Sequence, residues 1–118
     1  GEHHGTEDNW CPSIMVLGSA VTAVTHHINV NLSAVLLPLH DPIMVAEDLA
    51  VLDIMAKGRL EVVVAAGYNS AEFEMFGVDR AKRGALMEDY VGVLRQAWTG
   101  EEFEYRGRKV RVTPRPAT

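Results

Sequence analysis

A glutamate and two histidines stand together near the start of the chain, in the order Glu2-His3-His4. Histidine changes its charge near neutral pH, so His3 or His4 could act as a general base or as a hydrogen-bond donor. With Glu7 or Asp8 these side chains are also metal-ligand types, but their spacing matches no zinc pattern. A tag remnant is a third interpretation, which the glutamate and the continuous sequence after it make weaker. We favour a proton-handling role and predict no metal site.

No other segment matches a familiar catalytic motif. The chain contains no phosphate-binding Gly-x-x-x-x-Gly-Lys loop, no Gly-x-Gly-x-x-Gly, no Cys-x-x-Cys and no Gly-x-Ser-x-Gly. Cys11 is the single cysteine, has no neighbouring base to activate it and excludes an internal disulfide, which suits a reducing compartment. The residues alone therefore indicate a histidine at a ligand-binding position and no more specific chemistry.

The overall charge and hydropathy argue against several kinds of partner. The net charge is −5 and acidic and basic residues are interspersed, without the basic face that a nucleic-acid-binding protein usually needs. Hydrophobic residues make up 47% of the sequence, but no apolar run reaches the roughly 18 residues of a membrane span, and no signal peptide is present. We expect a soluble, cytoplasmic globular protein with neither nucleic acid nor membrane as its partner.

Residues 28–68 organise the rest of the chain as a strand, a helix and a second strand. The strands are expected over 28–37 and 59–66, and the helix between them begins at Asp41-Pro42 and ends at Lys57-Gly58. Strands joined by a crossover helix are parallel, and their sheet is covered by helices. Gly67 leads the chain out at the C-terminal end of the second strand, where α/β folds bind their ligands.

The first of these strands has one polar face. With strict alternation, one face carries Ile28, Val30, Leu32, Ala34 and Leu36, and the other carries Asn29, Asn31, Ser33, Val35 and Leu37. A strand covered on both sides is usually continuously apolar, as residues 62–66 of the second strand are. The polar face is expected to look into a barrel interior or a site. Ordinary buried asparagines, bonded to a neighbouring layer, explain it equally well.

Further elements flank this unit. We predict a helix over 14–24 that ends ordinarily at Thr25-His26-His27, a helical turn over 71–75, a helix from Asp79 to Gly100 and a hairpin over 101–112. The βα pattern begins within one unit and stops in a loop, whereas a complete βα barrel has about 250 residues. We therefore expect a partial segment of a larger α/β protein.

Several strings of this sequence carry a family resemblance. EHH near the start, AVLLPLHDPIMVAEDLAVLDIMAKGRLEVVVAAGY in the middle, and EFEMFGVDR and TPRP later resemble, in order, the bacterial luciferase-like flavin-dependent monooxygenases. That family has a TIM (β/α)8 barrel fold. The resemblance implies that this chain is a partial segment of the barrel, from about the end of strand 2 to helix 4, followed by the start of an insertion.

The resemblance also implies a reaction. Family members use reduced FMN, usually supplied by a separate flavin reductase, and dioxygen to oxygenate a small organic substrate. They act on paired donors with incorporation of molecular oxygen, and they pair as homo- or heterodimers. Two other hypotheses about the function stay open. One is a deazaflavin-dependent oxidoreductase on the same barrel, and the other is a non-catalytic flavin-binding or subunit-partner protein.

Residue by residue, the resemblance implies roles for the N-terminal histidines and for the first strand. His3 falls on the histidine taken as catalytic in the luciferases, and His4 is its neighbour. The peptide bond between Ser33 and Ala34 falls on a non-proline cis peptide beneath the flavin ring. Small side chains there would leave room for that ring.

At the end of the second strand, 59–66, this sequence matches the family at some positions and differs from it at others. Ala66 and Tyr68 fall where the family contacts flavin. Luciferases carry a reactive cysteine at the position of Ala65, so a general monooxygenase is favoured over light emission from an aldehyde. The family often has an arginine at the position of Ala66 that helps to hold the flavin phosphate, and this chain lacks it.

Overall fold

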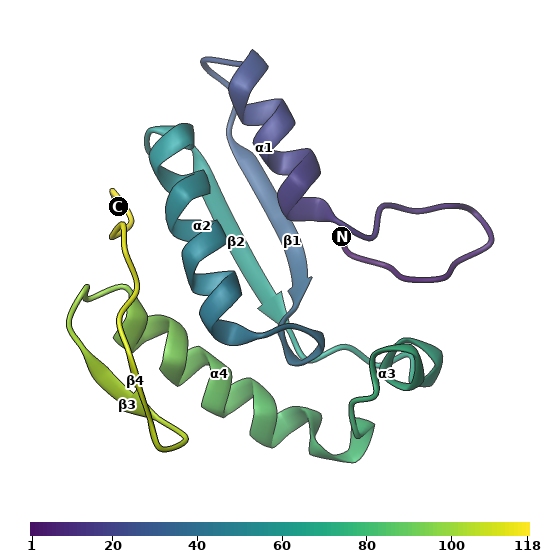
Figure 1. The fold of residues 1–118 in the computed structure, drawn as a ribbon. Coiled ribbons are helices and arrows are strands. Elements are labelled where there is room, and N and C mark those ends of the chain that lie inside the picture. The colour runs from purple at the N-terminus through teal and green to yellow at the C-terminus, as the bar shows by residue number, and fades with distance from the viewer.

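The structure is a computed structural model that describes residues 1–118, and it contains one parallel βαβ unit with helical and hairpin additions (Figure 1). In chain order the elements are α1 (Ile14–Val24), β1 (Val30–Leu36), the 3₁₀ turn η1 (Leu37–Leu39), α2 (Pro42–Ala56), β2 (Leu60–Ala65), α3 (Ser70–Phe76), the 3₁₀ turn η2 (Arg80–Lys82), α4 (Arg83–Ala97), β3 (Phe103–Tyr105) and β4 (Arg108–Val110). No helix has the length and apolar character that crossing a bilayer requires.

The predicted βαβ unit is confirmed. β1 and β2 are parallel neighbours, from the pair Val30 and Leu60 at one end to Leu36 and Ala65 at the other. Asp41 is the N-cap of α2, and its Oδ1 accepts hydrogen bonds from the backbone N–H of Ile43 at 2.8 Å and Met44 at 3.4 Å. Lys57 has a φ of 53° and Gly58 a φ of 84°, so the left-handed helix end predicted there is present.

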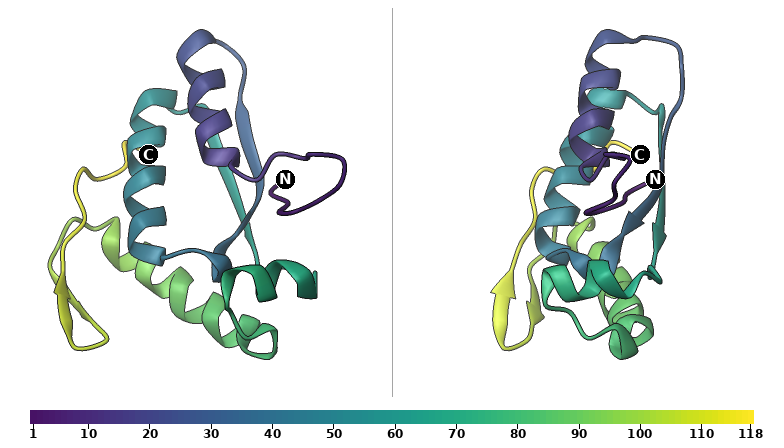
Figure 2. Two further views of the ribbon diagram at one scale, coloured as in Figure 1. Left: turned by 45° about the vertical axis from the view of Figure 1, so that its right-hand side comes forward. Right: turned by 90° about the vertical axis from the view of Figure 1, so that its right-hand side faces the viewer.

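The helices cover one face of the two-stranded sheet and leave the other face open (Figure 2). α1 comes close to β1 because residue 18 is a glycine: a Cβ added there would lie 2.8 Å from the Leu32 side chain. The open face carries exposed side chains of Asn31, Ser33, Glu61 and Val63. The expectation that residues 62–66 are covered on both faces is wrong within this chain, since Val63 is exposed on the open face.

α2 is the centre of the hydrophobic core. Its Val45, Leu49 and Leu52 are at most 2% exposed, and α4 packs beside it. The Trp98 indole N–H donates to the Ala46 carbonyl at 3.0 Å and joins the end of α4 to α2. The predicted hairpin is confirmed as β3 and β4, and it packs Tyr105, Val110 and Val112 into the same core.

The first strand does not alternate strictly. The pairing with β2 shifts between Ser33 and Val35, so that Ala34 is an extra residue in β1. Val35 therefore lies in the buried cluster with Val30 and Leu32, and it is 0% exposed. The prediction that placed Val35 on the polar face is wrong because one inserted residue reverses the alternation beyond it.

Other boundaries differ by a few residues. The first strand begins at Val30 rather than at residue 28, and the predicted helical turn is the longer α3. Asp79 caps a 3₁₀ turn, with its carboxylate accepting from the Ala81 N–H at 3.0 Å, and α4 begins at Arg83 and ends at Ala97. The helix predicted from Asp79 therefore begins later, and Asp79 caps the turn that precedes it.

Candidate active site

An open cavity of about 360 Å³ lies at the C-terminal ends of β1 and β2, beside the first residues of the chain. This is the edge at which α/β folds bind ligands. The cavity brings together every predicted site residue except His4, and it is lined by Gly1, Glu2, His3, Ser33, Ala34, Leu36, Ala65, Ala66, Gly67 and Tyr68.

The floor of the cavity is made of small groups. The peptide bond between Ser33 and Ala34 is cis, as the resemblance implies. A Cβ added to Gly1 would lie 3.0 Å from the carbonyl oxygen of Ser33, so the chain passes very close to this floor. The small side chains of Ser33, Ala34 and Ala66 leave room for a flat ring, and these residues therefore fit a flavin lying against β1.

An extended N-terminal segment forms the wall of the cavity. Its successive backbone N–H groups are all bonded: Glu2 donates to the Ala34 carbonyl at 3.3 Å, His3 to the Cys11 carbonyl at 3.3 Å and His4 to Glu72 Oε1 at 2.9 Å. Side chains alternate along extended backbone. The His3 side chain therefore lines the cavity, while the carboxylate of Glu2 and the imidazole of His4 turn away from it and meet each other.

His3 is accessible to a ligand. Its side chain is 44% exposed, and its Nδ1 lies 4.0 Å from Oε1 of the buried Glu72 carboxylate. Its ring faces the edge of Trp10, with 6.5 Å between the ring centroids, and the Trp10 indole N–H donates to the Gly1 carbonyl at 2.8 Å. In this position the imidazole could accept or donate a proton at a ligand in the cavity.

His4 is not placed in the cavity. Its side chain is 7% exposed, its Nε2 lies 3.0 Å from Glu2 Oε2, and its ring packs edge-on against Phe76 at 4.7 Å. The two neighbouring histidines therefore have different environments, and the buried one faces a carboxylate and an aromatic ring.

Glu2 is the centre of a buried polar cluster that the sequence did not reveal. Its carboxylate also meets His40, whose Nε2 lies 2.8 Å from Oε1 and 3.0 Å from Oε2. Burial acts to raise the pKa of Glu2, but the hydrogen bonds of His40 and His4 outweigh it and hold this pKa below the ordinary value of 4.5. No group of His, Cys, Asp and Glu side chains is arranged to hold a metal ion.

Glu2, His40 and Glu72 are site residues that sequence reasoning missed. The available signal was the position of His40, in the short connection after β1 and directly before the Asp41 cap, at the same edge of the sheet as Glu2. A glutamate beside an apolar strand end also needs a partner when it is buried. Neither signal identifies which side chains meet.

A larger cavity, of about 480 Å³, lies at the opposite end of the strands, near Thr22, His26, Lys57 and Arg59. It contains none of the predicted site residues. The Arg59 guanidinium there already donates hydrogen bonds to the carbonyls of Ala56, Ile28 and Thr22 and to the Thr25 hydroxyl. Its N–H groups are therefore used to bind acceptors at the C-terminal ends of α1 and α2. We therefore assign the site to the smaller cavity.

The sequence as a whole matches one family. The family model described as luciferase-like monooxygenase covers residues 1–118. An uncharacterized protein of Mycobacterium tuberculosis is 38% identical over 110 residues, which are 92% of this chain and 37% of that protein. The alkanal monooxygenase alpha chain of Photorhabdus luminescens is 30% identical over 118 residues, covering 96% of this chain and 33% of that one. The oxygenase component of the flavin-dependent trigonelline monooxygenase of Acinetobacter baylyi is 28% identical over 109 residues, covering 91% and 30%.

Solved structures share the fold. The monooxygenase RslO1 from Streptomyces bottropensis superposes with a TM-score of 0.87 at 26% identity, covering 99% of this chain and 37% of that one. The oxygenating constituent of 3,6-diketocamphane monooxygenase from Pseudomonas putida, solved with FMN, has a TM-score of 0.84 at 21% identity, covering 96% and 32%. The chain spans about a third of the length of the relatives it matches. This chain belongs to the luciferase-like monooxygenase family.

Proposed function

We propose that the protein carrying this chain is a flavin-dependent monooxygenase that uses reduced FMN and dioxygen to oxygenate a small organic substrate. The observation that carries the proposal is the position of His3. Its partly exposed imidazole lines a cavity floored by Ser33 and Ala34 at the ends of two parallel strands. The name of the Acinetobacter relative, a flavin-dependent monooxygenase, supports the choice of cofactor.

The residues of the cavity would have different roles in binding the flavin and in the reaction. Ser33, Ala34 and Ala66 would support one face of the flavin ring, and the exposed ring of Tyr68 would lie at the mouth of the cavity. Bound reduced flavin would supply the electrons for oxygen activation. His3 would hold or transfer a proton at the substrate as a base or hydrogen-bond donor. His4 would act indirectly, because its contact with the Glu2 carboxylate helps to hold the segment that carries His3. With an alanine at position 66, the flavin phosphate must be held by other residues.

The proposed architecture is a segment of a TIM barrel. β1 and β2 would be adjacent barrel strands, and α1 and α2 would lie in the outer helical ring. The uncovered sheet face with Asn31, Ser33 and Glu61 would then look into the barrel, which supports the interpretation of the polar face as an interior one. Asn31 Nδ2 donates to Glu61 Oε2 at 3.1 Å across that face.

The proposed partners are a flavin reductase and a second subunit. The Acinetobacter relative is an oxygenase component, which implies a separate reductase for that protein, and the Photorhabdus relative is the alpha chain of its enzyme. The helices α1 and α2 expose Val16, Val51 and Ile54, the kind of apolar surface that a subunit contact covers. Light scattering on the full-length protein tests this, and a monomer at all concentrations would contradict it.

Oxygen consumption tests the proposed reaction. The full-length protein is supplied with chemically reduced FMN, and uptake is compared with that of free reduced FMN alone. Uptake above the free-flavin background, with a candidate substrate present, supports an oxygenase. Uptake at the background rate would overturn the proposal and favour a non-catalytic flavin binder. The absorbance spectrum of the bound cofactor separates a flavin from a deazaflavin.

A further inference from the structure

The buried Glu2 carboxylate ties together two segments that are far apart in the sequence. Its side chain is 1% exposed, and both of its oxygens lie within 3.0 Å of an imidazole nitrogen, from His4 in its own segment and from His40 at the end of η1. Hydrogen bonds to a charged acceptor are about twice as strong as neutral ones. The cluster thus joins the N-terminal segment to the connection between β1 and α2.

His3 lies between the two cluster members of its own segment and has no short side-chain bond of its own. Its nearest charged group, Glu72 Oε1, is 4.0 Å from Nδ1. The backbone bonds that hold Glu2 and His3 are 3.3 Å long, whereas the carboxylate contacts of Glu2 are 2.8–3.0 Å. The position of the His3 ring over the cavity therefore depends on how firmly its neighbours are held.

We propose that Glu2 is a positioning residue for His3: by binding His4 and His40 together it fixes the backbone that directs His3 into the cavity. The proposal rests on the proposed function of the cavity for its kinetic consequence, but its structural consequence is independent of any cofactor. Loss of the carboxylate charge frees the segment, and His3 then samples positions away from the floor formed by Ser33 and Ala34.

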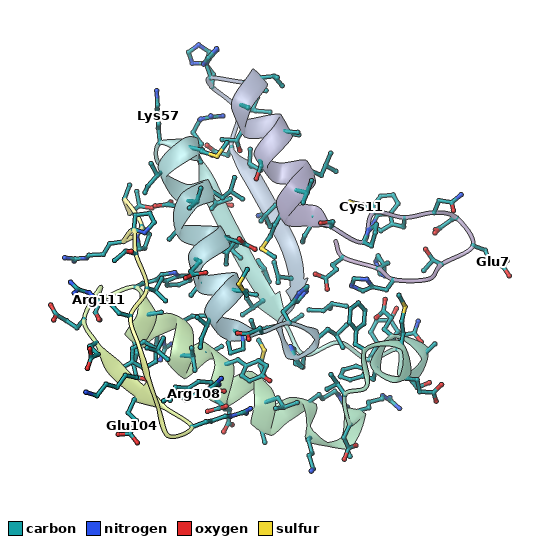
Figure 3. The ribbon with its side chains drawn as sticks, in the orientation of Figure 1. Glu7, Cys11, Lys57, Glu104, Arg108 and Arg111 are labelled. Atoms are coloured by element: carbon teal, nitrogen blue, oxygen red, sulfur yellow. The ribbon has the colours of Figure 1, made fainter.

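The test compares E2Q with E7Q in the full-length protein. Both changes remove one carboxylate charge from the same segment, but Glu7 is exposed at the far end of the loop (Figure 3), and its carboxylate forms no hydrogen bond or ion pair. Trp10, which borders His3 and bonds to Gly1, serves as the reporter. Its resonance in protein labelled with 5-fluorotryptophan is identified by its loss in W10F.

In the cofactor-free protein, E2Q is expected to shift or broaden the Trp10 fluorine resonance, while E7Q leaves it unchanged. In the loaded enzyme, E2Q is expected to lower kcat/KM by about tenfold or more, the effect of losing a hydrogen bond to a buried charge. H40Q is expected to have the same two effects. The double variant E2Q/H40Q should be no worse than E2Q alone, because the contact that H40Q removes is already lost in E2Q.

Three results would overturn the proposal. An unchanged Trp10 resonance in E2Q is one, strictly additive losses in E2Q and H40Q are a second, and a loss of activity that follows the unfolded fraction is a third. If the unmodified protein has no flavin-dependent activity, the proposed function fails, but the fluorine spectra of E2Q and E7Q still decide the positioning role.

Discussion

At the scale of single residues, the N-terminal segment gives two adjacent histidines different environments. Extended backbone sends His3 toward the cavity and His4 toward Glu2, so the exposed ring is available to a ligand and the buried ring is not. An imidazole that must exchange protons needs access to the reacting molecule. His3 is therefore the residue whose loss should affect the chemistry most directly.

Replacing His3 by alanine in the full-length protein should lower kcat by about 100- to 10,000-fold, the range for removing a general acid or base. The thermal midpoint should change little, because the side chain is 44% exposed. Steady-state kinetics and calorimetry measure the two effects. H26A is the control, since His26 is exposed at the other end of the strands. Equal activity of H3A and the unmodified protein would remove the assigned role.

The buried carboxylate should make stability depend on acidity. The pKa of Glu2 is lower in the folded state than its ordinary value of 4.5 because His40 and His4 bind the charged form. Its contribution is then fully present above about pH 4.5 and is lost as the pH falls through the lowered folded pKa. Urea unfolding between pH 3 and 6 should show E2Q about 1–3 kcal/mol less stable at pH 6 and closer to the unmodified protein at pH 3. If the unfolding free energies of E2Q and the unmodified protein differ by the same amount at every pH, this prediction is wrong.

At the scale of elements, local signals explain α2 well and β1 less well. Asp41, Pro42 and the Lys57-Gly58 end act through backbone groups within a few residues of themselves. In β1, Ala34 is an extra residue, so the alternation of side chains between the two faces reverses after it and Val35 lies in the core. No propensity of Ala34 predicts that insertion, because it depends on how β1 pairs with β2.

The cap of α2 can be tested by a matched pair of substitutions. Asp41→Ala should cost about 1 kcal/mol of unfolding free energy, because it leaves the N–H groups of Ile43 and Met44 without their acceptor. Asp41→Asn keeps an oxygen in the same place and should cost less. Chemical denaturation of the full-length protein measures both. Equal losses in the two variants would mean that charge, rather than capping, is what matters at this position.

At the scale of the whole molecule, the chain is a thin layer with principal extents of 41 × 38 × 15 Å. Helices cover one side of the two-stranded sheet, and the other side is open (Figure 2). β1 and β2 pair with each other alone, so each also has one unpaired edge. Such edges invite pairing with other chains unless another segment covers them.

The 118-residue chain expressed by itself should therefore bind FMN much more weakly than the full-length protein and should self-associate. Quenching of flavin fluorescence measures the first effect, and light scattering over a range of concentrations measures the second. Binding should be weak because this chain supplies only one floor and one wall of the cavity. Self-association should follow because the open face and the edges of the sheet stay uncovered. Tight flavin binding by a monodisperse chain would contradict this.

Much of the fold was predictable from the sequence because its signals are local. Apolar spacing, the Asp41-Pro42 start and the run of residues 62–66 predict a parallel βαβ unit without any long-range information. The family strings add the cis peptide between Ser33 and Ala34, which is present. The elements of the unit depend on backbone preferences and on short contacts along the chain, whereas the cis peptide was expected only from the resemblance.

The arrangement of the candidate site depended on tertiary structure. The sequence by itself determined the elements, the family and the presence of two histidines beside a glutamate. It did not determine that His3 lines the cavity while His4 is buried, or that Glu2 meets His40, 38 residues away. Those outcomes follow from where the N-terminal segment lies against β1 and η1, because a buried carboxylate must find donors in whatever segments the fold brings beside it.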